Sequence, residues 1–351
     1  MKTNKPSYSP SWVDRLTDWI ESLAIPIWAF YLIVYLVAAI SLNMASWING
    51  VRPWGEISLF LLYNAIWQPL GLIVIHNTDL LAEKALDRFA PLVRGKEKAL
   101  ETIRYEMTTM PARTVGWIWA IAFTLLLISA IQDPEFVVLE MVDGYIHPAS
   151  WVISALFGIT SYSLAPLMIY HAIRQLNRVT KAYALIDDVS IFHQQPLYAF
   201  SGLTMRTALF LVGQVYITYL GEGIADPSSI EGLITLGLSA VIVPLSLLIV
   251  LLPLLGIHQR LSEAKLDALE ENSFQVERTQ GKLYAAVDKD KYDAIGGLDQ
   301  ALSSLYKVRE QLKSVATWPW APGALRNFMS AVLLPMLVWA LQFALDKLFG
   351  A

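Results

Sequence analysis

The stretch LITLGLSAVIVPLSLLIVLLPLLGI, residues 233–257, decides the fold class. It carries no charged side chain, and about 20 consecutive apolar residues are enough for a helix to cross the hydrocarbon core of a bilayer. Six other stretches are apolar enough to do the same, although the shortest, at 207–220, crosses only if Arg206 snorkels to the surface. The predicted spans are residues 25–42, 57–75, 115–131, 151–170, 207–220, 233–257 and 328–345. We therefore predict an all-α integral membrane protein, a seven-transmembrane helix bundle.

The composition agrees with a membrane environment. Hydrophobic residues make up 55% of the 351 residues and charged residues 16%, whereas a soluble domain carries about 25% charged residues. The net charge is -4 and the basic residues form no stripe with stacking aromatics, so we expect the lipid bilayer and no nucleic acid as a partner. Cysteine is absent, which excludes disulfides and thiolate metal sites. Residues 1–24 lack the pattern of a cleaved signal peptide and are interpreted as a retained tail.

The distribution of Lys and Arg predicts the orientation. Basic residues concentrate in the cytoplasmic loops of membrane proteins. With a cytoplasmic N-terminus and an outer C-terminus, every Lys and Arg except Arg52 and Lys347 lies on the cytoplasmic side. The loops at 132–150 and 221–232 then face outward, where their acidic residues could concentrate cations near an opening or simply reflect the exclusion of basic residues.

The long connection between the last two predicted spans is expected to be a cytoplasmic helical hairpin. Leu298, Leu302, Leu305, Val308, Leu312 and Val315 form an apolar seam at helical spacing, Leu269, Val276 and Leu283 form another, and residues 288–297 are the predicted turn. The seams could pack on each other within one chain or join subunits. We divide the chain into residues 1–257 with the tail and six spans, residues 258–325 with the hairpin, and residues 326–351 with the seventh span and a short outer tail.

Motifs for enzymatic chemistry are missing, so we expect neither an enzyme nor a bound cofactor or metal. His76, His171 and His258 end the second, fourth and sixth spans, as a pH-sensing ring or as polar tips in the headgroup zone. Polar residues within spans, such as Gln68, Thr160 and Ser161, are expected to hydrogen-bond neighbouring helices. No matched pair of interrupted spans is evident, although Gln68-Pro69, Pro244, Pro253 and Pro335 could each kink a helix.

The last span contains the candidate pore residues. Pro335, Val338, Gln342 and Asp346 lie at helical spacing on one face. From the cytoplasm outward they supply a kink, an apolar ring, an amide and an outer carboxylate. Repeated around a symmetry axis, this order would suit a cation path with a hydrophobic gate.

Two resemblances accompany these patterns. The segments RYEMTTMPAR (104–113), PLYAFSGLTMRTA (196–208) and ATWPWAPGALRNF (316–328) resemble a family of uncharacterised bacterial polytopic membrane proteins, which implies the inner (plasma) membrane. The topology resembles the insect gustatory and odorant receptor superfamily of ligand-gated cation channels. That family's last-span signature, Thr-Tyr, five apolar residues and Gln-Phe, is matched here by residues 337–341 and Gln342-Phe343, while Pro335-Met336 replaces Thr-Tyr. This resemblance implies a homotetramer whose seventh spans line the pore, gated by a small-molecule ligand.

Three functional hypotheses follow. The first is a homo-oligomeric cation channel or channel-like receptor, with a tetramer favoured and Pro335, Val338, Gln342 and Asp346 lining the pore. The second is a non-conducting membrane sensor or scaffold whose hairpin binds a soluble partner. The third is a small-solute transporter, which would need a polar cavity near the middle of the bilayer within one subunit.

Overall fold

The computed structural model describes residues 8–187, 189, 191, 195–222, 230–320, 323, 325–333 and 337. This part of the chain is helical and contains no named strand, only isolated bridges between Pro10 and Pro111 and between Val142 and Tyr145. The all-α class is therefore confirmed. The helices are α1 (Trp12–Ser22), α2 (Ile27–Ile48), α3 (Leu59–Asn64), α4 (Trp67–Phe89), η1 (Ala90–Val93), α5 (Glu97–Thr108), α6 (Ala112–Gln132), η2 (Pro134–Phe136), α7 (Pro148–Ser163), α8 (Ala165–Tyr183), η3 (Gln195–Tyr198), α9 (Ser201–Glu222), α10 (Ile230–Asp288) and α11 (Tyr292–Ser314).

Five helical segments in the described part are long and apolar enough to cross a membrane. They are Ile27–Ile48, Leu59–Val93, Ala112–Gln132, Pro148–Tyr183 and Pro244–Asp288, and they contain or overlap the first four predicted spans and the sixth. The fifth predicted span lies in the helix α9, which is not among the five segments found in the described residues. The seventh predicted span lies partly outside the described residues. The count of seven spans therefore stays a prediction.

Successive helix pairs follow one plan, which the hydropathy pattern did not predict. The pairs are α2 with α3–α4, α6 with α7–α8, and α9 with α10. The second member of each pair carries a Pro-Leu dipeptide and then a histidine after a short apolar run. The motifs run from Pro69 to His76, from Pro166 to His171 and from Pro253 to His258. The first two pairs are each preceded by a short helix, α1 and α5, so this part of the bundle repeats an architecture of short helix, span and interrupted span.

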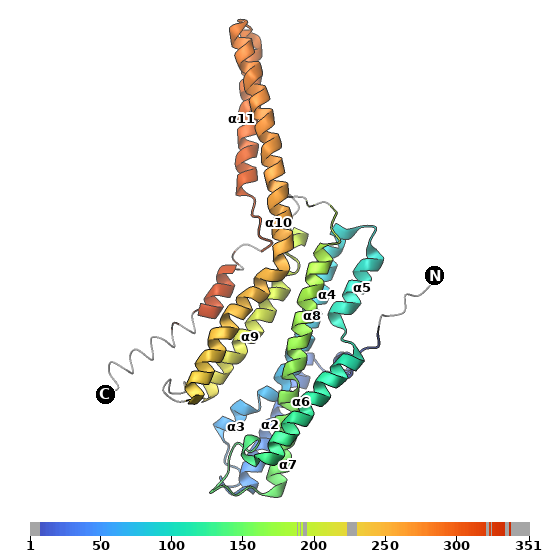
Figure 1. Ribbon diagram of the computed structural model, residues 1–351, viewed down its shortest axis with the longest axis vertical. Coiled ribbons are helices and arrows are strands. Elements are labelled where there is room, and N and C mark those ends of the chain that lie inside the picture. Colours follow the sequence, from blue (N-terminus) through green and yellow to red (C-terminus); the bar gives the residue numbers. More distant parts are fainter. Residues whose placement is uncertain are drawn as a thin grey trace, which may run out of the picture.

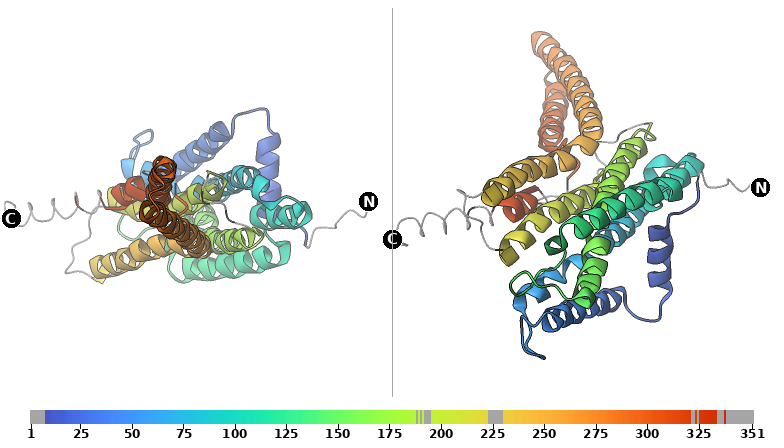
Figure 2. Two further views of the ribbon diagram at one scale, coloured as in Figure 1. Left: turned by 90° about the horizontal axis from the view of Figure 1, so that it is seen from above. Right: turned by 60° about the horizontal axis from the view of Figure 1, so that its bottom comes forward.

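The connections between helices lie at two opposite ends of the bundle. Figure 1 shows the α10–α11 hairpin rising from the end where α4 and α8 finish and where α5 lies. The connections from α2 to α3 and from α6 to α7 lie at the opposite end. The short helix α1 runs crosswise to α2 (Figure 2). Its buried side includes Val13, Thr17 and Ile20, while Trp19 remains exposed, as expected for a helix lying along a membrane surface.

The hairpin seam packs within the chain. Along α10, Val276 is buried and Leu269 and Leu283 are partly buried against α11. Asn272, buried in the same seam, donates from Nδ2 to the Leu305 carbonyl at 3.1 Å. One buried polar residue in such a seam fixes the register of the two helices. Val308 is the exception among the predicted α11 seam residues, because it is 40% exposed.

The predicted turn of the hairpin was too long. α10 continues to Asp288 and α11 begins at Tyr292, so Gly296 and Gly297 lie inside a helix. The chain reverses in three residues because Asp290 adopts a left-handed φ of 49° and the Lys291 amide donates to the Ala286 carbonyl at 2.9 Å. The helix α10 also crosses the boundary predicted after residue 257 without interruption.

Candidate functional site

Two apolar helical segments are each interrupted by a kink of one or two residues whose backbone stays in the right-handed helical region, contrary to the expectation of no matched pair. The first breaks between α3 and α4 at residues 65–66, and the second breaks between α7 and α8 at Leu164. Each break is followed by a proline in the first turn of the next helix, Pro69 in α4 and Pro166 in α8. Proline lacks an amide hydrogen and clashes with the carbonyl four residues earlier, so it favours a helix start at these positions.

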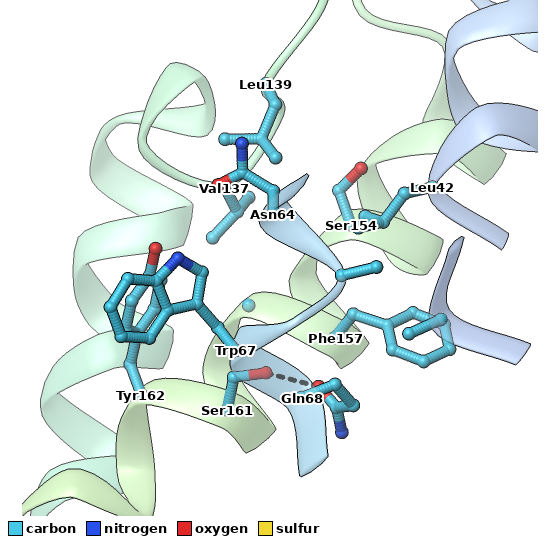
Figure 3. A pocket seen from close by; sticks show the side chains of 13 residues that line it. Leu42, Asn64, Trp67, Gln68, Val137, Leu139, Ser154, Phe157, Ser161 and Tyr162 are labelled. Carbon is cyan, nitrogen blue, oxygen red and sulfur yellow. Dashed lines mark hydrogen bonds between the residues drawn. The ribbon is translucent and has the colours of Figure 1, made fainter. Parts of the chain in front are cut away.

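The two breaks lie against each other. Gly71 in α4 packs so closely on Leu164 that an added Cβ would lie 2.9 Å from the Leu164 Cβ. Gln68 Nε2 donates to Thr160 Oγ1 at 3.1 Å, and the Ser161 hydroxyl donates to Gln68 Oε1 (Figure 3). The expectation that these polar residues hydrogen-bond neighbouring helices is confirmed. Only the folded chain reveals that they join two helix breaks.

Two cavities flank this contact. One of about 30 Å³, room for roughly one water, is lined by α2, α3, α4, α7 and the loop after η2, and includes Asn64, Gln68 and Ser161. Its neighbour of about 210 Å³ extends toward α9. The larger cavity is lined by Trp67, Leu70, Gly71, Ser161, Tyr162, Ala165, Met168 and Gln214. Trp67, Ser161 and Tyr162 line both cavities, and Figure 3 shows them around the smaller one. None of these side chains is ionisable near neutral pH, so the site suits a small neutral solute.

The histidines expected at span ends are held by acidic or aromatic partners that the sequence did not indicate. His76 is buried between Tyr31 and Glu21, with Nδ1 2.9 Å from the Tyr31 hydroxyl and Nε2 2.9 Å from Glu21 Oε1. His258 stacks on Trp318 with ring centroids 4.0 Å apart. Each histidine therefore has a separate partner, and the arrangement is neither a shared ring nor a set of exposed polar tips.

The most buried of these pairs joins α4 to α8. His171 Nε2 lies 2.9 Å from Asp79 Oδ1, and both side chains are largely buried. Gln175 Nε2 donates to the same Asp79 oxygen at 2.9 Å and also to the Met107 carbonyl at 3.2 Å. The contact thus connects α5 as well. Asp79 lies beyond the predicted end of its span, which is why no role was predicted for it.

The N-terminal segment is fixed to this end of the bundle. The Tyr8 hydroxyl donates to the Thr109 carbonyl at 2.9 Å, and the Arg174 guanidinium lies over the Tyr8 ring. Burial raises the pKa of Tyr8 to about 12 despite the opposing field of Arg174, so the hydroxyl stays protonated as a donor. Asp14 accepts from the amides of Ser11 and Met110 at 2.7 and 3.0 Å, which joins α1 to the start of α6.

A second polar network closes the opposite end. Glu140 accepts hydrogen bonds from the hydroxyls of Ser46 and Ser58 at 2.5 and 2.6 Å and from Arg52 Nε at 3.2 Å. Burial disfavours the Glu140 carboxylate, but the hydrogen bonds from Arg52, Ser46 and Ser58 outweigh it and lower its pKa. Glu140 is therefore an internal structural anion rather than a free charge on an acidic rim.

The candidate pore residues Pro335, Val338, Gln342 and Asp346 lie outside the described residues. Within the described part, no group of His, Asp and Glu side chains is arranged to hold a metal ion. The sequence signal for the paired breaks was present in Pro69 and Pro166, each within a polar stretch of an apolar span. Treating them as one repeated motif would have found the site. Comparisons with protein-family models, curated proteins and solved structures gave no match.

Proposed function

We propose that the protein is a multi-pass protein of the inner (plasma) membrane that binds a small neutral solute between its two interrupted spans, as a carrier or receptor. The observation that carries this proposal is the contact of the two helix breaks at Gln68, Thr160 and Ser161 beside the 210 Å³ cavity. Membrane transporters form solute sites where paired helices are interrupted, and here the polar side chains beside the kinks could bind the solute. The cavity size limits the solute to a few heavy atoms.

The proposal includes seven spans with the hairpin in the cytoplasm. The hairpin and the basic loops around η1 and α5 share one end of the bundle in Figure 1, and the acidic loop containing Asp133, Glu135 and Asp143 lies at the other. This arrangement agrees with the bias of Lys and Arg toward the cytoplasm. The N-terminus then lies inside and the C-terminus outside.

Solute binding is tested in vesicles containing the purified protein. We expect at least one of a panel of small neutral solutes, such as glycerol, urea and short alcohols, to raise the thermal stability of the protein or to cross the membrane faster. Ser161→Ala should weaken that effect about tenfold, because Ser161 lines the 210 Å³ cavity and a lost polar contact of about 1.4 kcal/mol corresponds to that factor. Ser129→Ala, a hydroxyl deletion in α6 away from both cavities, is the control. An equal response from both variants, or none from the wild type, would contradict the proposal.

A homo-oligomeric cation channel is the second candidate function, because the hairpin carries apolar side chains outside its internal seam. Leu266, Phe274 and Tyr284 are 65%, 59% and 66% exposed on α10, more than a solvated hairpin needs. In this proposal hairpins of several copies associate, with a tetramer favoured by the resemblance. The seventh spans then surround a pore lined by Pro335, Val338, Gln342 and Asp346. A scaffold that binds a soluble partner is the competing explanation of the same surface.

The oligomer proposal is tested by measuring particle mass in nanodiscs and cation flux in vesicles. We expect a closed oligomer, its disruption by Leu266→Glu with Phe274→Glu, and altered flux in Val338→Asn and Gln342→Ala. A charge reversal at an exposed position of α10 away from that face, Lys282→Glu, should leave the mass unchanged. A monomer with no flux, recovered with a stoichiometric soluble protein, would instead support the scaffold.

A further inference from the structure

A groove between α2 and α4 opens sideways from the bundle and shares only Leu70 with the lining of the solute site. Its volume is about 850 Å³, and its lining includes Trp28, Leu32, Tyr35, Leu70 and Ile73. Trp28 is 69% exposed and Leu32 is 46% exposed, so both contact whatever surrounds the bundle. Because α2 and α4 belong to segments apolar enough to cross a membrane, the surroundings are hydrocarbon.

The length of the groove matches one leaflet. Its lining extends along α4 from Ile66, at the helix break, to Leu80. At a rise of about 1.5 Å per residue this is about 21 Å, of which about 17 Å separates Ile66 from Asn77 at the polar end of the groove. One leaflet contributes about 15 Å of hydrocarbon, half of a core about 30 Å thick. An acyl chain that starts at the membrane surface would therefore end near the break.

The surface end of the groove is polar. Asn77 and His76 line the groove at this end. Within the described part of the chain, the Asn77 side-chain amide has no hydrogen-bond partner. His76 is already paired with Tyr31 and Glu21. An amide beside an apolar groove can donate to a lipid ester or phosphate oxygen. A second copy of the chain would bring mainly apolar helix surface and leave the amide unpaired, which is costly in a membrane.

The charge beside this end selects among lipids. Helix α1 carries Asp18 and Glu21 on its exposed surface, and Glu21 Oε1 is 2.9 Å from His76. Two carboxylates attract an ammonium group and repel a lipid whose headgroup is only anionic. Moving an acyl chain from bulk lipid into an apolar groove gains little, because both surroundings are apolar. If the groove retains one lipid in preference to another, the difference must therefore come from contacts with the headgroup.

We propose that the α2–α4 groove binds a zwitterionic phospholipid with an ammonium headgroup. One acyl chain lies along Leu32, Leu70 and Ile73. Asn77 donates to the ester or phosphate, and Asp18 and Glu21 contact the ammonium group. The site shares only Leu70 with the lining of the solute cavity and differs from it in its opening and its ligand, and it does not depend on the proposed function.

The experiment is native mass spectrometry of the full chain taken from nanodiscs that contain equal amounts of phosphatidylethanolamine and phosphatidylglycerol. We expect retained phosphatidylethanolamine to exceed phosphatidylglycerol about tenfold, equivalent to about 1.4 kcal/mol. Ile73→Trp should fill the groove and remove the retained lipid. Ile40→Trp, on an exposed position of α2 outside the groove lining, should retain it.

Two further variants distinguish lipid retention as a whole from the preference for one headgroup. Asn77→Leu should reduce retention of both lipids, and Asp18→Asn with Glu21→Gln should abolish the preference for phosphatidylethanolamine while lipid is still retained. Circular dichroism confirms that each variant is folded. Equal retention of the two lipids by the wild type, or retention unchanged by Ile73→Trp, would overturn the proposal. A dimer that Ile73→Trp dissociates would show instead that the groove is an interface between copies.

Discussion

Replacing Gly71 by alanine is expected to destabilise the protein by about 1–3 kcal/mol, the usual range for overpacking a tight contact. The added Cβ would lie 2.9 Å from the Cβ of Leu164, and Leu164 is buried at the start of α8. A rotamer change cannot relieve this contact, because the Leu164 Cβ is fixed to its backbone. The two interrupted spans must therefore move apart, and Gly71→Val should have a larger effect than Gly71→Ala.

The measurement is denaturant or thermal unfolding in a mild detergent, compared with Gly116→Ala. Gly116 lies inside α6, and no atom outside its own helical neighbourhood is within 4 Å of the position that an added Cβ would take. The Gly116 change should leave stability unaltered or raise it by up to about 1 kcal/mol through helix propensity. If Gly71→Ala were as stable as wild type, the close contact of the two breaks would be wrong. Separation of the breaks should also change the solute response.

Replacing His171 by phenylalanine is expected to cost about 3 kcal/mol or more. The change removes the partner 2.9 Å from Asp79, and a buried carboxyl group that loses a polar partner keeps its desolvation cost without that compensation. Gln175 remains as a donor to the same oxygen, but one neutral amide does not replace a charged or strongly polar imidazole. The loss of stability should be accompanied by looser packing of α4 against α8.

The matched control is His258→Phe at the equivalent position of the third helix pair. His258 stacks on Trp318, and a phenylalanine ring keeps such stacking, so the expected loss is below about 1 kcal/mol. Unfolding in detergent and the protease sensitivity of the α4–α5 connection are the measurements. Asp79→Asn combined with His171→Phe should recover much of the stability, because the buried charge is then absent. No recovery in the double variant would argue against the His171–Asp79 contact as the cause.

Local periodicity predicted several elements correctly. Apolar runs correctly located four of the long helical segments, all in the first half of the chain. The apolar spacing along α10 and α11 also predicted that Val276 and Leu312 are buried in the interface between these two helices. These features depend on spacing along one helix, which the sequence contains. The error at Gly296 and Gly297 arose because glycine is only a weak helix breaker, whereas the turn depends on the left-handed conformation of Asp290.

The candidate site was only partly predictable. Gln68, Thr160 and Ser161 could be recognised as polar residues that need partners, because an amide or hydroxyl facing lipid is costly. Their mutual contact could not be derived, since Gln68 and Ser161 are far apart in the chain and belong to different helix pairs. The predicted pore residues lie outside the described residues and remain a prediction.

The sequence by itself determined that the chain is helical and apolar enough for a membrane, because backbone groups in hydrocarbon must be satisfied within each helix and the apolar runs are long enough. The tertiary structure alone decided which polar residues meet. The pairs His171 with Asp79, Gln68 with Ser161, and Ser58 with Glu140 each join segments distant along the chain. Hydropathy measures the transfer of single residues into lipid, whereas such pairing depends on how whole helices pack, and no single-residue property contains that information.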